Sequence, residues 1–382
     1  MKSEFKAGLL DNDLFKITPE NYFQSIVSKQ VIIWGTGEKG DLVYKLYKNY
    51  SNEHKVLYYA DNNQEKWGGE KNYRKVISPI DVKKLALEDE NLLIIIGTEN
   101  LTIKQQLLSY GILEKNIDTK VLGIAKDSFK FVEKTPFNII NENYQNFESV
   151  YNSLEDTLSK QIYLGILNMK ISLDNSYIEG LNSPENEQYF AKDLIKLTEN
   201  EIFVDCGSFN GDTLNSFLVN SNRKFSKYIA FEADKRIFGE LNKKIVEENL
   251  INADISTYNY AVWHKEDVLR FQTGGTSGNV SFDGDIEVQA NSLDNVLEDT
   301  HVTFIKMDIE GAEVDALLGA EMSIKNNHPI LAICLYHDLE HYYQIPNLIK
   351  KFNPEYKLFI RHYRDLFDLE TVCYAIPKSR LK

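Results

Sequence analysis

Two apolar runs in this sequence stop on residues that can exchange a proton. The run FIKM stops at Asp308, with Glu310 two residues later, and the run PILAICLY stops at His337. Carboxylates and imidazole can remove the proton of an alcohol, which makes Asp308, Glu310 and His337 candidate catalytic residues. The two acids could equally serve as N-terminal acids of the helix that follows, and the histidine could be a hydrogen-bonded structural one.

A glycine loop follows another apolar strand earlier in the chain. In the stretch FVDCGSFNGDT the predicted strand ends on Asp205, and Gly207 and Gly211 precede a predicted helix. Glycine lets the backbone approach a ligand without a Cβ in the way, and a helix N-terminus offers free N–H groups. The next predicted strand ends on Glu232, where an acid can accept both hydroxyls of a ribose. The stretch therefore predicts a site for a ribose-containing ligand.

These side chains need a parallel sheet to bring them together. From residue 201 onward apolar strands alternate with helices, which is typical of a parallel sheet covered on both faces. Asp205, Glu232, Asp308 and His337 end four different strands of that pattern. Open α/β sheets bind ligands at the carboxyl ends of their strands. We therefore expect the four residues to face one cleft.

The end of the chain and a central excursion complete this second sheet. The segments YKLFIRHY and ETVCYAIP lie about six residues apart, which favours an antiparallel hairpin at one edge. Residues 264–300 contain short alternating runs around a glycine-rich loop at 272–285. The composition of that loop fits two interpretations equally well, a lid over the substrate and a plain solvent-exposed loop.

The strand order resembles that of class I S-adenosylmethionine-dependent methyltransferases. The motifs FVDCGSFNGDT, IKMDIEGAE, QYF at 188–190 and SLDNVL at 292–297 narrow this resemblance to the FkbM family, over about residues 150–377. It implies a seven-stranded sheet with an antiparallel last strand and S-adenosylmethionine as the cofactor. It also implies an O-methyltransferase acting on a hydroxyl of a sugar or nucleotide-sugar, in surface polysaccharide or glycan biosynthesis.

The resemblance also implies which residues bind the cofactor and leaves two routes for the proton. The cofactor-binding residues are Asp205, Gly207, Gly211, Asp212, Thr213, Glu232 and, through its backbone, Ala261. In one route Asp308, Glu310 or His337 accepts the proton of the acceptor hydroxyl, and His337 is the better base by its intrinsic pKa. In the other, a divalent metal ion held by Asp308, His337 and His362 lowers the pKa of a bound hydroxyl.

A second glycine motif lies near the N-terminus. Gly35, Gly37 and Gly40 give G-x-G-x-x-G after a strand and before a helix, and Asp61 ends the next strand. Alone, this motif favours an NAD-dependent nucleotide-sugar oxidoreductase or epimerase. The unit also resembles the small nucleotide-binding domains that precede sugar-modifying enzymes, where such a turn holds a nucleotide-sugar. A Rossmann-like domain that has lost its ligand and now serves as a scaffold or dimer surface fits the pattern equally well.

Length and hydrophobic pattern set the domain organisation. The chain has 382 residues, which favours two α/β domains, both Rossmann-like. We expect a small Rossmann-like domain at residues 1–125, a helical connector at 126–200 and the methyltransferase domain at 201–382. In the first domain, apolar strands that alternate with helices over residues 30–125 also predict a parallel sheet.

Composition restricts the partners and the compartment. The net charge of −14 argues against nucleic acid as a partner, because phosphate backbones are bound by clustered positive charge. No apolar run approaches the roughly 18 residues of a membrane span. The three cysteines lie in apolar segments and are expected to be buried reduced thiols in the cytoplasm. A homo-oligomer is compatible with the sequence.

Overall fold

The computed structural model divides into two compact units. It describes residues 3–13, 19–50, 53–98, 102–121, 134–250, 253–272, 279–280, 286–364 and 367–382. The first unit comprises Met1–Glu142, Leu164–Gly180 and Asp365–Phe367. The second comprises Asn143–Tyr163, Leu181–Arg364 and Asp368–Lys382. Residues 143–163 and 181–200, which the sequence suggested as part of a connector, thus belong to the second unit.

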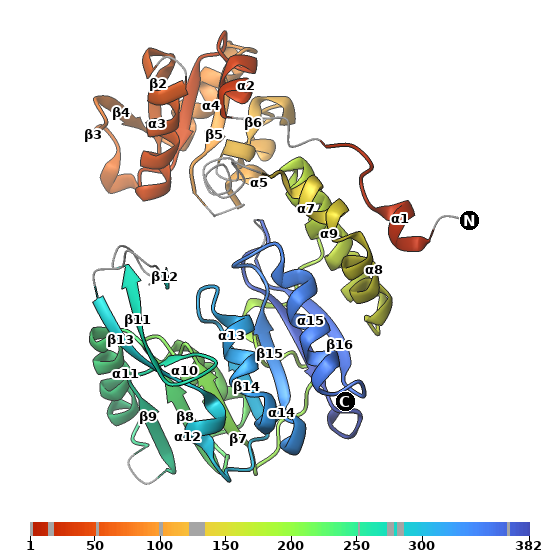
Figure 1. Ribbon diagram of the computed structural model, residues 1–382. Helices are drawn as coiled ribbons and strands as arrows, with labels where there is room; N and C mark the ends of the chain where they lie inside the picture. The colour runs from red at the N-terminus through yellow and green to blue at the C-terminus, as the bar shows by residue number, and fades with distance from the viewer. Residues whose placement is uncertain are drawn as a thin grey trace. The chain divides into compact units, whose positions relative to one another are not determined.

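The first unit is built on a six-stranded sheet (Figure 1). Its strand order is β3-β4-β2-β1-β5-β6. The strands are β1 (Val31–Trp34), β2 (Val56–Ala60), β3 (Glu70–Lys71), β4 (Arg74–Ile77), β5 (Leu93–Ile96) and β6 (Ile117–Asp118). Its helices include α1 (Glu4–Gly8), α2 (Pro19–Ser25), α3 (Glu38–Tyr50), α4 (Pro79–Glu88), α5 (Thr102–Ser109) and α7 (Pro136–Glu142).

The expectation of a purely parallel sheet in the first unit was wrong at one edge. Strands β1, β2 and β5 are the apolar strands that the sequence indicated, and they pair in parallel. The short strand β3 pairs antiparallel with β4. The sequence did not indicate β3, β4 or β6, because β3 and β6 have two residues each and β4 begins with two cations. Such segments carry too little hydrophobic periodicity to be recognised.

The second unit contains the predicted seven-stranded sheet, coloured green to blue in Figure 1. Its order is β16-β17-β15-β14-β7-β8-β9. The strands are β7 (Ile202–Cys206), β8 (Lys227–Phe231), β9 (Ile255–Tyr258), β14 (Phe304–Met307), β15 (Ile330–Cys334), β16 (Lys357–His362) and β17 (Thr371–Ile376). Strand β17 pairs antiparallel with both β15 and β16, and the other neighbours are parallel. The α/β class and the antiparallel last strand are confirmed.

Helices and a smaller sheet complete this unit. The helices are α8 (Tyr144–Ser153), α9 (Thr157–Ser172, divided between the units), α10 (Asp212–Asn220), α11 (Lys235–Glu247), α12 (Leu293–Leu297), α13 (Glu313–Leu318), α14 (Glu321–Asn327) and α15 (His341–Phe352). The excursion forms a four-stranded sheet of β10 (Ala261–Val262), β11 (Asp267–Gln272), β12 (Asn279–Val280) and β13 (Ile286–Asn291). Most of the predicted lid loop, residues 273–278 and 281–285, lies outside the described residues.

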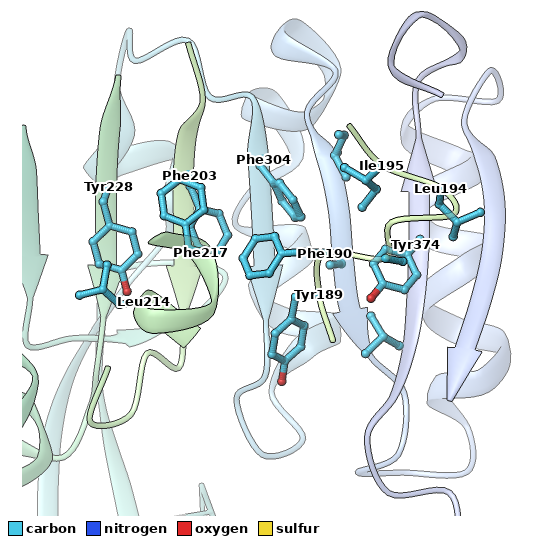
Figure 2. Close-up of a cluster of buried hydrophobic side chains, with 14 of the residues drawn as sticks. Tyr189, Phe190, Leu194, Ile195, Phe203, Leu214, Phe217, Tyr228, Phe304 and Tyr374 are labelled. Carbon is cyan, nitrogen blue, oxygen red and sulfur yellow. The ribbon is translucent and has the colours of Figure 1, made fainter. Parts of the chain in front are cut away.

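An aromatic core fixes the middle strands of the large sheet. Phe190 packs edge-on against Phe203 of β7 and Phe304 of β14, with ring centroids 5.6 and 5.7 Å apart. Phe217 of α10 lies 4.6 Å from Phe203. Figure 2 shows these rings together, with Tyr189 next to Phe190 in the chain. The segment that precedes the sheet is thereby held against it, which matters because Tyr189 reaches the site described below.

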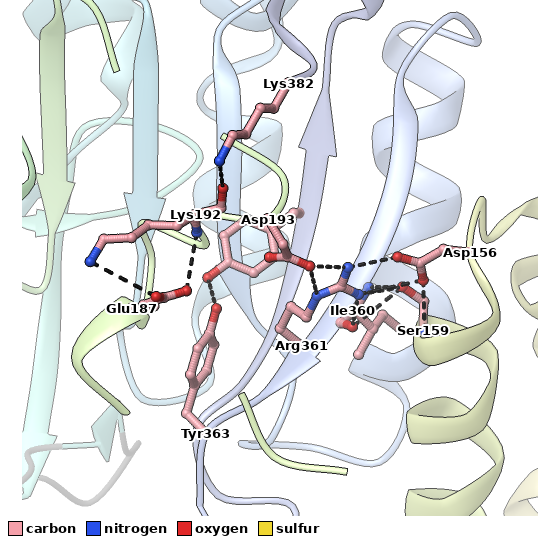
Figure 3. A network of polar contacts seen from close by, with 10 residues as sticks. Asp156, Ser159, Glu187, Lys192, Asp193, Ile360, Arg361, Tyr363 and Lys382 are labelled. Atoms are coloured by element: carbon pink, nitrogen blue, oxygen red, sulfur yellow. Dashed lines mark hydrogen bonds and ion pairs between the residues drawn. The ribbon is translucent and has the colours of Figure 1, made fainter. Parts of the chain in front are cut away.

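A buried arginine ties two more segments to the edge of the sheet. The guanidinium of Arg361 on β16 donates to the carboxylates of Asp156 and Asp193, with 2.6 Å between its Nη2 and each acceptor oxygen (Figure 3). Asp156 also accepts the backbone N–H of Ser159, so it caps the start of α9. Burial would raise the pKa of Asp156, but its hydrogen bonds to Arg361 and Ser159 hold the pKa below its ordinary value.

Replacing Asp156 with alanine is expected to lower the free energy of unfolding by about 2–4 kcal/mol, because it removes a helix cap and a partner of a buried charge. Since the folded-state pKa is lowered, this stabilisation is present at neutral pH and is lost as the pH falls through that pKa. Urea unfolding measures the change. Asp254→Ala removes the more exposed ion pair to Lys227 and should cost less than about 1 kcal/mol. Equal losses would contradict the role given to Asp156.

Candidate active site

A cleft of about 1220 Å³ lies in the second unit and is lined by the loops that follow β7, β8 and β14. Gly207, Glu232 and Asp308, one from each of these loops, line it together. Parallel neighbours place their carboxyl ends at one edge of a sheet, which is why residues far apart in sequence meet there. Of the four strand-end residues expected to share a cleft, Glu232 and Asp308 line it directly.

The glycine loop makes a close backbone contact that only glycine allows. Gly207 has a φ of +76°, and a Cβ added to it would lie 1.9 Å from the backbone oxygen of Asp308. The loops after β7 and β14 therefore touch through their backbones. Gly211, with a φ of +88°, stands immediately before α10, and Asp212 and Thr213 begin the helix and line the cleft.

Glu232 joins two of these loops. Its carboxylate accepts the backbone N–H of Phe209 at 3.0 Å and that of Asp234 at 2.8 Å. Burial raises its pKa, although both backbone donors oppose the shift. Ala261, which was expected to bind the cofactor through its backbone, also lines the cleft. Glu232 and Ala261 thus occupy one cleft, as a nucleoside site requires.

Asp205 does not line this cleft. Its side chain is fully buried, with one carboxylate oxygen 3.0 Å from Nζ of Lys306 and the other accepting the hydroxyl of Tyr228 at 2.7 Å. Lys306, by contrast, is among the lining residues. The acid of the glycine motif therefore lies beneath the site, behind a lysine to which the sequence gave no role.

Asp308 is the best-connected carboxylate in the cleft. Tyr189 donates its hydroxyl to Oδ2 at 2.7 Å, and Tyr336 donates to Oδ1 at 3.0 Å. Nε2 of His337 lies 3.4 Å from Oδ1. Burial alone would raise the pKa of Asp308, but the charges of Lys306 and His337 hold it below its ordinary value. Asp308 is therefore an anion at neutral pH.

His337 lies among carboxylates. Its Nδ1 is 2.9 Å from Glu313, and its Nε2 is 3.4 Å from Glu310 as well as from Asp308. Burial would lower the pKa of His337, but Glu313, Asp308 and Glu310 raise it to about 9. In this state the imidazole is protonated at neutral pH, and both of its nitrogens face carboxylates. The intrinsic pKa, which suggested His337 as the better base, does not describe this environment.

Strained backbone gathers around the cleft. Tyr189, Phe209, Glu310 and Glu370 all line it, and all four have φ between +46° and +66°. Such conformations cost non-glycine residues about 1–3 kcal/mol each and are retained mainly where function requires the geometry. Tyr189 and Glu313 lie within the motifs QYF and IKMDIEGAE, but the sequence analysis assigned a site role neither to them nor to Tyr336 and Glu370.

Residues 205–365 match the model of the Methyltransferase FkbM domain. These residues form an FkbM methyltransferase domain. The protein is therefore an S-adenosylmethionine-dependent methyltransferase, as its motifs predicted. Residues 27–118 match the model described as C2185-like, N-terminal.

A solved structure shares the fold of the chain along nearly its whole length. The crystal structure of a methyltransferase FkbM from Methylobacillus flagellatus has 22% identity and a TM-score of 0.70, over 97% of this chain and 98% of that one. A putative methyltransferase from Streptococcus mutans, with S-adenosylhomocysteine, matches at 13% identity and a TM-score of 0.31, over 49% of this chain and 93% of its own. No curated protein sequence matches the chain.

His362 is not part of the site of the FkbM domain. It is buried, and its Nδ1 lies 2.9 Å from Oγ1 of Thr371. Burial lowers its pKa to about 4. Among the described residues, the group with metal-ligand spacing consists of Asp308, Glu313 and His337. The structure thus brings together Asp308 and His337, two of the three residues that the sequence suggested as metal ligands, and places Glu313 beside His337.

The first unit carries the second glycine motif in the predicted place. An added Cβ on Gly40 would lie 2.0 Å from the backbone oxygen of Gly35, so these glycines allow close packing of strand and helix. Asp61 follows β2, and its carboxylate accepts hydrogen bonds from Thr36, from Lys66 at 2.8 Å and from the N–H of Asn63 at 2.9 Å.

Among the described residues, no helix has the length and apolar character needed to cross a membrane.

Proposed function

We propose that the FkbM domain transfers the methyl group of S-adenosylmethionine to a hydroxyl of a sugar or nucleotide-sugar. The observation that carries this proposal is that Asp308, Glu310 and Glu370 line the same cleft as Glu232. Carboxylates accept hydrogen bonds from the several hydroxyls of a sugar, and such a set of acceptors suits a polyhydroxylated substrate. The resemblance to the FkbM family extends the proposal to surface polysaccharide or glycan biosynthesis.

The roles of the residues follow from the chemistry of methyl transfer. The carbon–sulfur bond breaks with its electron pair going to sulfur, the oxygen–carbon bond forms, and the hydroxyl proton leaves. Positioning supplies much of the rate, and a general base assists the loss of the proton. In our proposal Glu232 accepts hydrogen bonds from the ribose hydroxyls, and Ala261 and the glycine loop contact the rest of the cofactor. Asp308, with Glu310, receives the proton of the acceptor hydroxyl, and the protonated His337 orients these two carboxylates.

A divalent metal ion is the second hypothesis for the proton. Glu313 faces Nδ1 of His337, and a carboxylate on one nitrogen is the usual support for a histidine that binds metal through the other. Asp308 and Glu310 lie 3.4 Å from that other nitrogen, so these donors fit a hard divalent cation. Such an ion would lower the pKa of a bound hydroxyl.

The metal hypothesis predicts that excess EDTA abolishes turnover and that Mg²⁺ or Mn²⁺ restores it, because the ion would be needed to ionise the acceptor. Methyl transfer before and after dialysis against the chelator measures this. Binding of S-adenosylhomocysteine in the same samples serves as the control and should not change. Turnover that survives chelation would leave proton removal to the carboxylates alone.

For the first unit we propose that Gly35, Gly37, Gly40 and Asp61 hold the nucleotide of the activated sugar. Support comes from the position of Asp61 after β2, at the carboxyl end of the parallel strands. The rival function, an NAD-dependent nucleotide-sugar oxidoreductase or epimerase, would use the same residues. Isothermal titration with UDP-sugars and with NAD separates the two functions. Tight binding of NAD, without binding of a nucleotide-sugar, would favour the rival.

A substrate screen tests the main proposal. The protein is incubated with S-adenosylmethionine carrying a deuterated methyl group and with a panel of sugars, nucleotide-sugars, amines and carboxylic acids. Mass spectrometry locates the label. We expect transfer to a sugar oxygen, and transfer only to nitrogen or carboxylate acceptors would overturn the proposal.

A further inference from the structure

Lys306 is a buried lysine that occupies the wall of the cofactor cleft. It lies on β14 directly opposite Asp205 on β7, and its side chain is 1% exposed. Its Nζ is 3.0 Å from Asp205 and donates to the backbone oxygen of Gly207 at 2.6 Å. It also lies 5.0 Å above the ring of Tyr189. The ammonium group of Lys306 therefore contacts strand β7 through Asp205, the glycine loop through Gly207 and the segment of Tyr189.

The charges around Lys306 explain why it can be buried. Burial alone would lower the pKa of Lys306, but the carboxylates of Asp205 and Asp308 outweigh burial and hold it above its ordinary value. An ammonium with three donors can satisfy both a carboxylate and a carbonyl. The ammonium of Lys306 is thus paired with Asp205 and donates a hydrogen bond to the glycine loop.

We infer that Lys306 is the positioning residue of the cofactor loop and that Asp205 acts through Lys306 instead of touching the cofactor. The inference rests on the proposed cofactor site. Gly207 has no Cβ, and its backbone packs against that of Asp308. A small shift of the Gly207 carbonyl would therefore move the glycine loop relative to Asp308, beside which the methyl group is transferred in our proposal. The hydrogen bond from Lys306 fixes that carbonyl.

This arrangement predicts which part of the cofactor depends on Lys306. Gly207 lies against Asp308, where the sulfur and the amino-acid part of the cofactor must be for transfer to occur. Glu232, which we assign to the ribose, is anchored separately by the N–H groups of Phe209 and Asp234. Loss of Lys306 should therefore weaken binding of the amino-acid part more than binding of the nucleoside part.

The test compares Lys306→Met, Asp205→Asn and the double variant with the unchanged full chain. The double variant removes both charges together, so no buried ion is left without its partner. Isothermal titration measures the Kd for S-adenosylhomocysteine and for 5′-methylthioadenosine, which lacks the amino-acid part. Thermal unfolding reports on the fold, and Lys224→Met removes an exposed lysine as a control.

We expect the double variant to fold and to bind S-adenosylhomocysteine at least tenfold more weakly, with the Kd for 5′-methylthioadenosine changed less than threefold. Asparagine can still accept from Lys306, so Asp205→Asn alone should weaken binding clearly less than loss of the lysine. Two results would overturn the inference. One is a folded double variant with unchanged affinity, and the other is a folded Asp205→Asn variant that loses tenfold or more. If the unchanged chain binds neither ligand, the cofactor site itself is refuted instead.

Discussion

Replacing Gly207 with alanine is expected to abolish cofactor binding, with a loss of affinity of more than about a hundredfold. The new Cβ would lie 1.9 Å from the backbone oxygen of Asp308, and alanine would have to keep a φ of +76°. Both the loop after β7 and the loop after β14 would have to move apart. Strain and overpacking of this kind should also lower the free energy of unfolding by about 3–5 kcal/mol.

Isothermal titration with S-adenosylhomocysteine and urea unfolding measure the two effects. Gly239→Ala is the matched control, because Gly239 is an exposed position in α11 and its added Cβ would meet nothing within 4 Å. That substitution should stabilise the protein by about 0.4–1 kcal/mol and leave the Kd unchanged. Wild-type affinity in Gly207→Ala would show that the two loops do not form the cofactor site.

Replacing Asp308 with asparagine is expected to lower turnover by about 10²- to 10⁴-fold while the affinity for the cofactor changes less than about threefold. Asparagine keeps the size of the side chain and can still accept from Tyr189 or Tyr336. It removes the negative charge that faces His337 and that we assign to the acceptor hydroxyl. Binding of the cofactor should persist because Glu232 and the glycine loop remain.

The rate of methyl transfer to the sugar found in the screen, together with titration of S-adenosylhomocysteine, measures this separation of turnover from affinity. Asp254→Asn is the control and should keep full activity, because Asp254 precedes β9 and pairs with Lys227 at the start of β8, at the opposite end of these strands from the cleft. Full turnover in Asp308→Asn would remove Asp308 from the chemistry. A parallel loss of affinity and turnover would assign it to the cofactor instead.

The sequence predicted the parts of the site that stand at strand ends. Gly207, Glu232 and Asp308 each follow an apolar run, and parallel strands bring their carboxyl ends to one edge. Hydrophobic runs of four or five residues were enough to find β7, β8 and β14. The same reasoning missed β3 and β6, which have two residues each and bury little apolar surface.

The rest of the site depends on packing that no local pattern reveals. Tyr189 reaches Asp308 across 119 residues of chain, because Phe190 is held in the aromatic core. Asp205 belongs to the glycine motif, yet its side chain is buried and pairs with Lys306 on the neighbouring strand β14 instead of lining the cleft. His337 has an ordinary intrinsic pKa, but three carboxylates raise it to about 9. Only tertiary structure determines such neighbours.

A crystal structure of the protein with S-adenosylhomocysteine would be decisive for where the cofactor binds. We expect the ribose hydroxyls at hydrogen-bond distance, about 2.7–3.2 Å, from the Glu232 carboxylate, with the sulfur directed toward Asp308. Ligand density beside Gly35 and Asp61 in the first unit, with the cleft of the FkbM domain empty, would contradict the site described here.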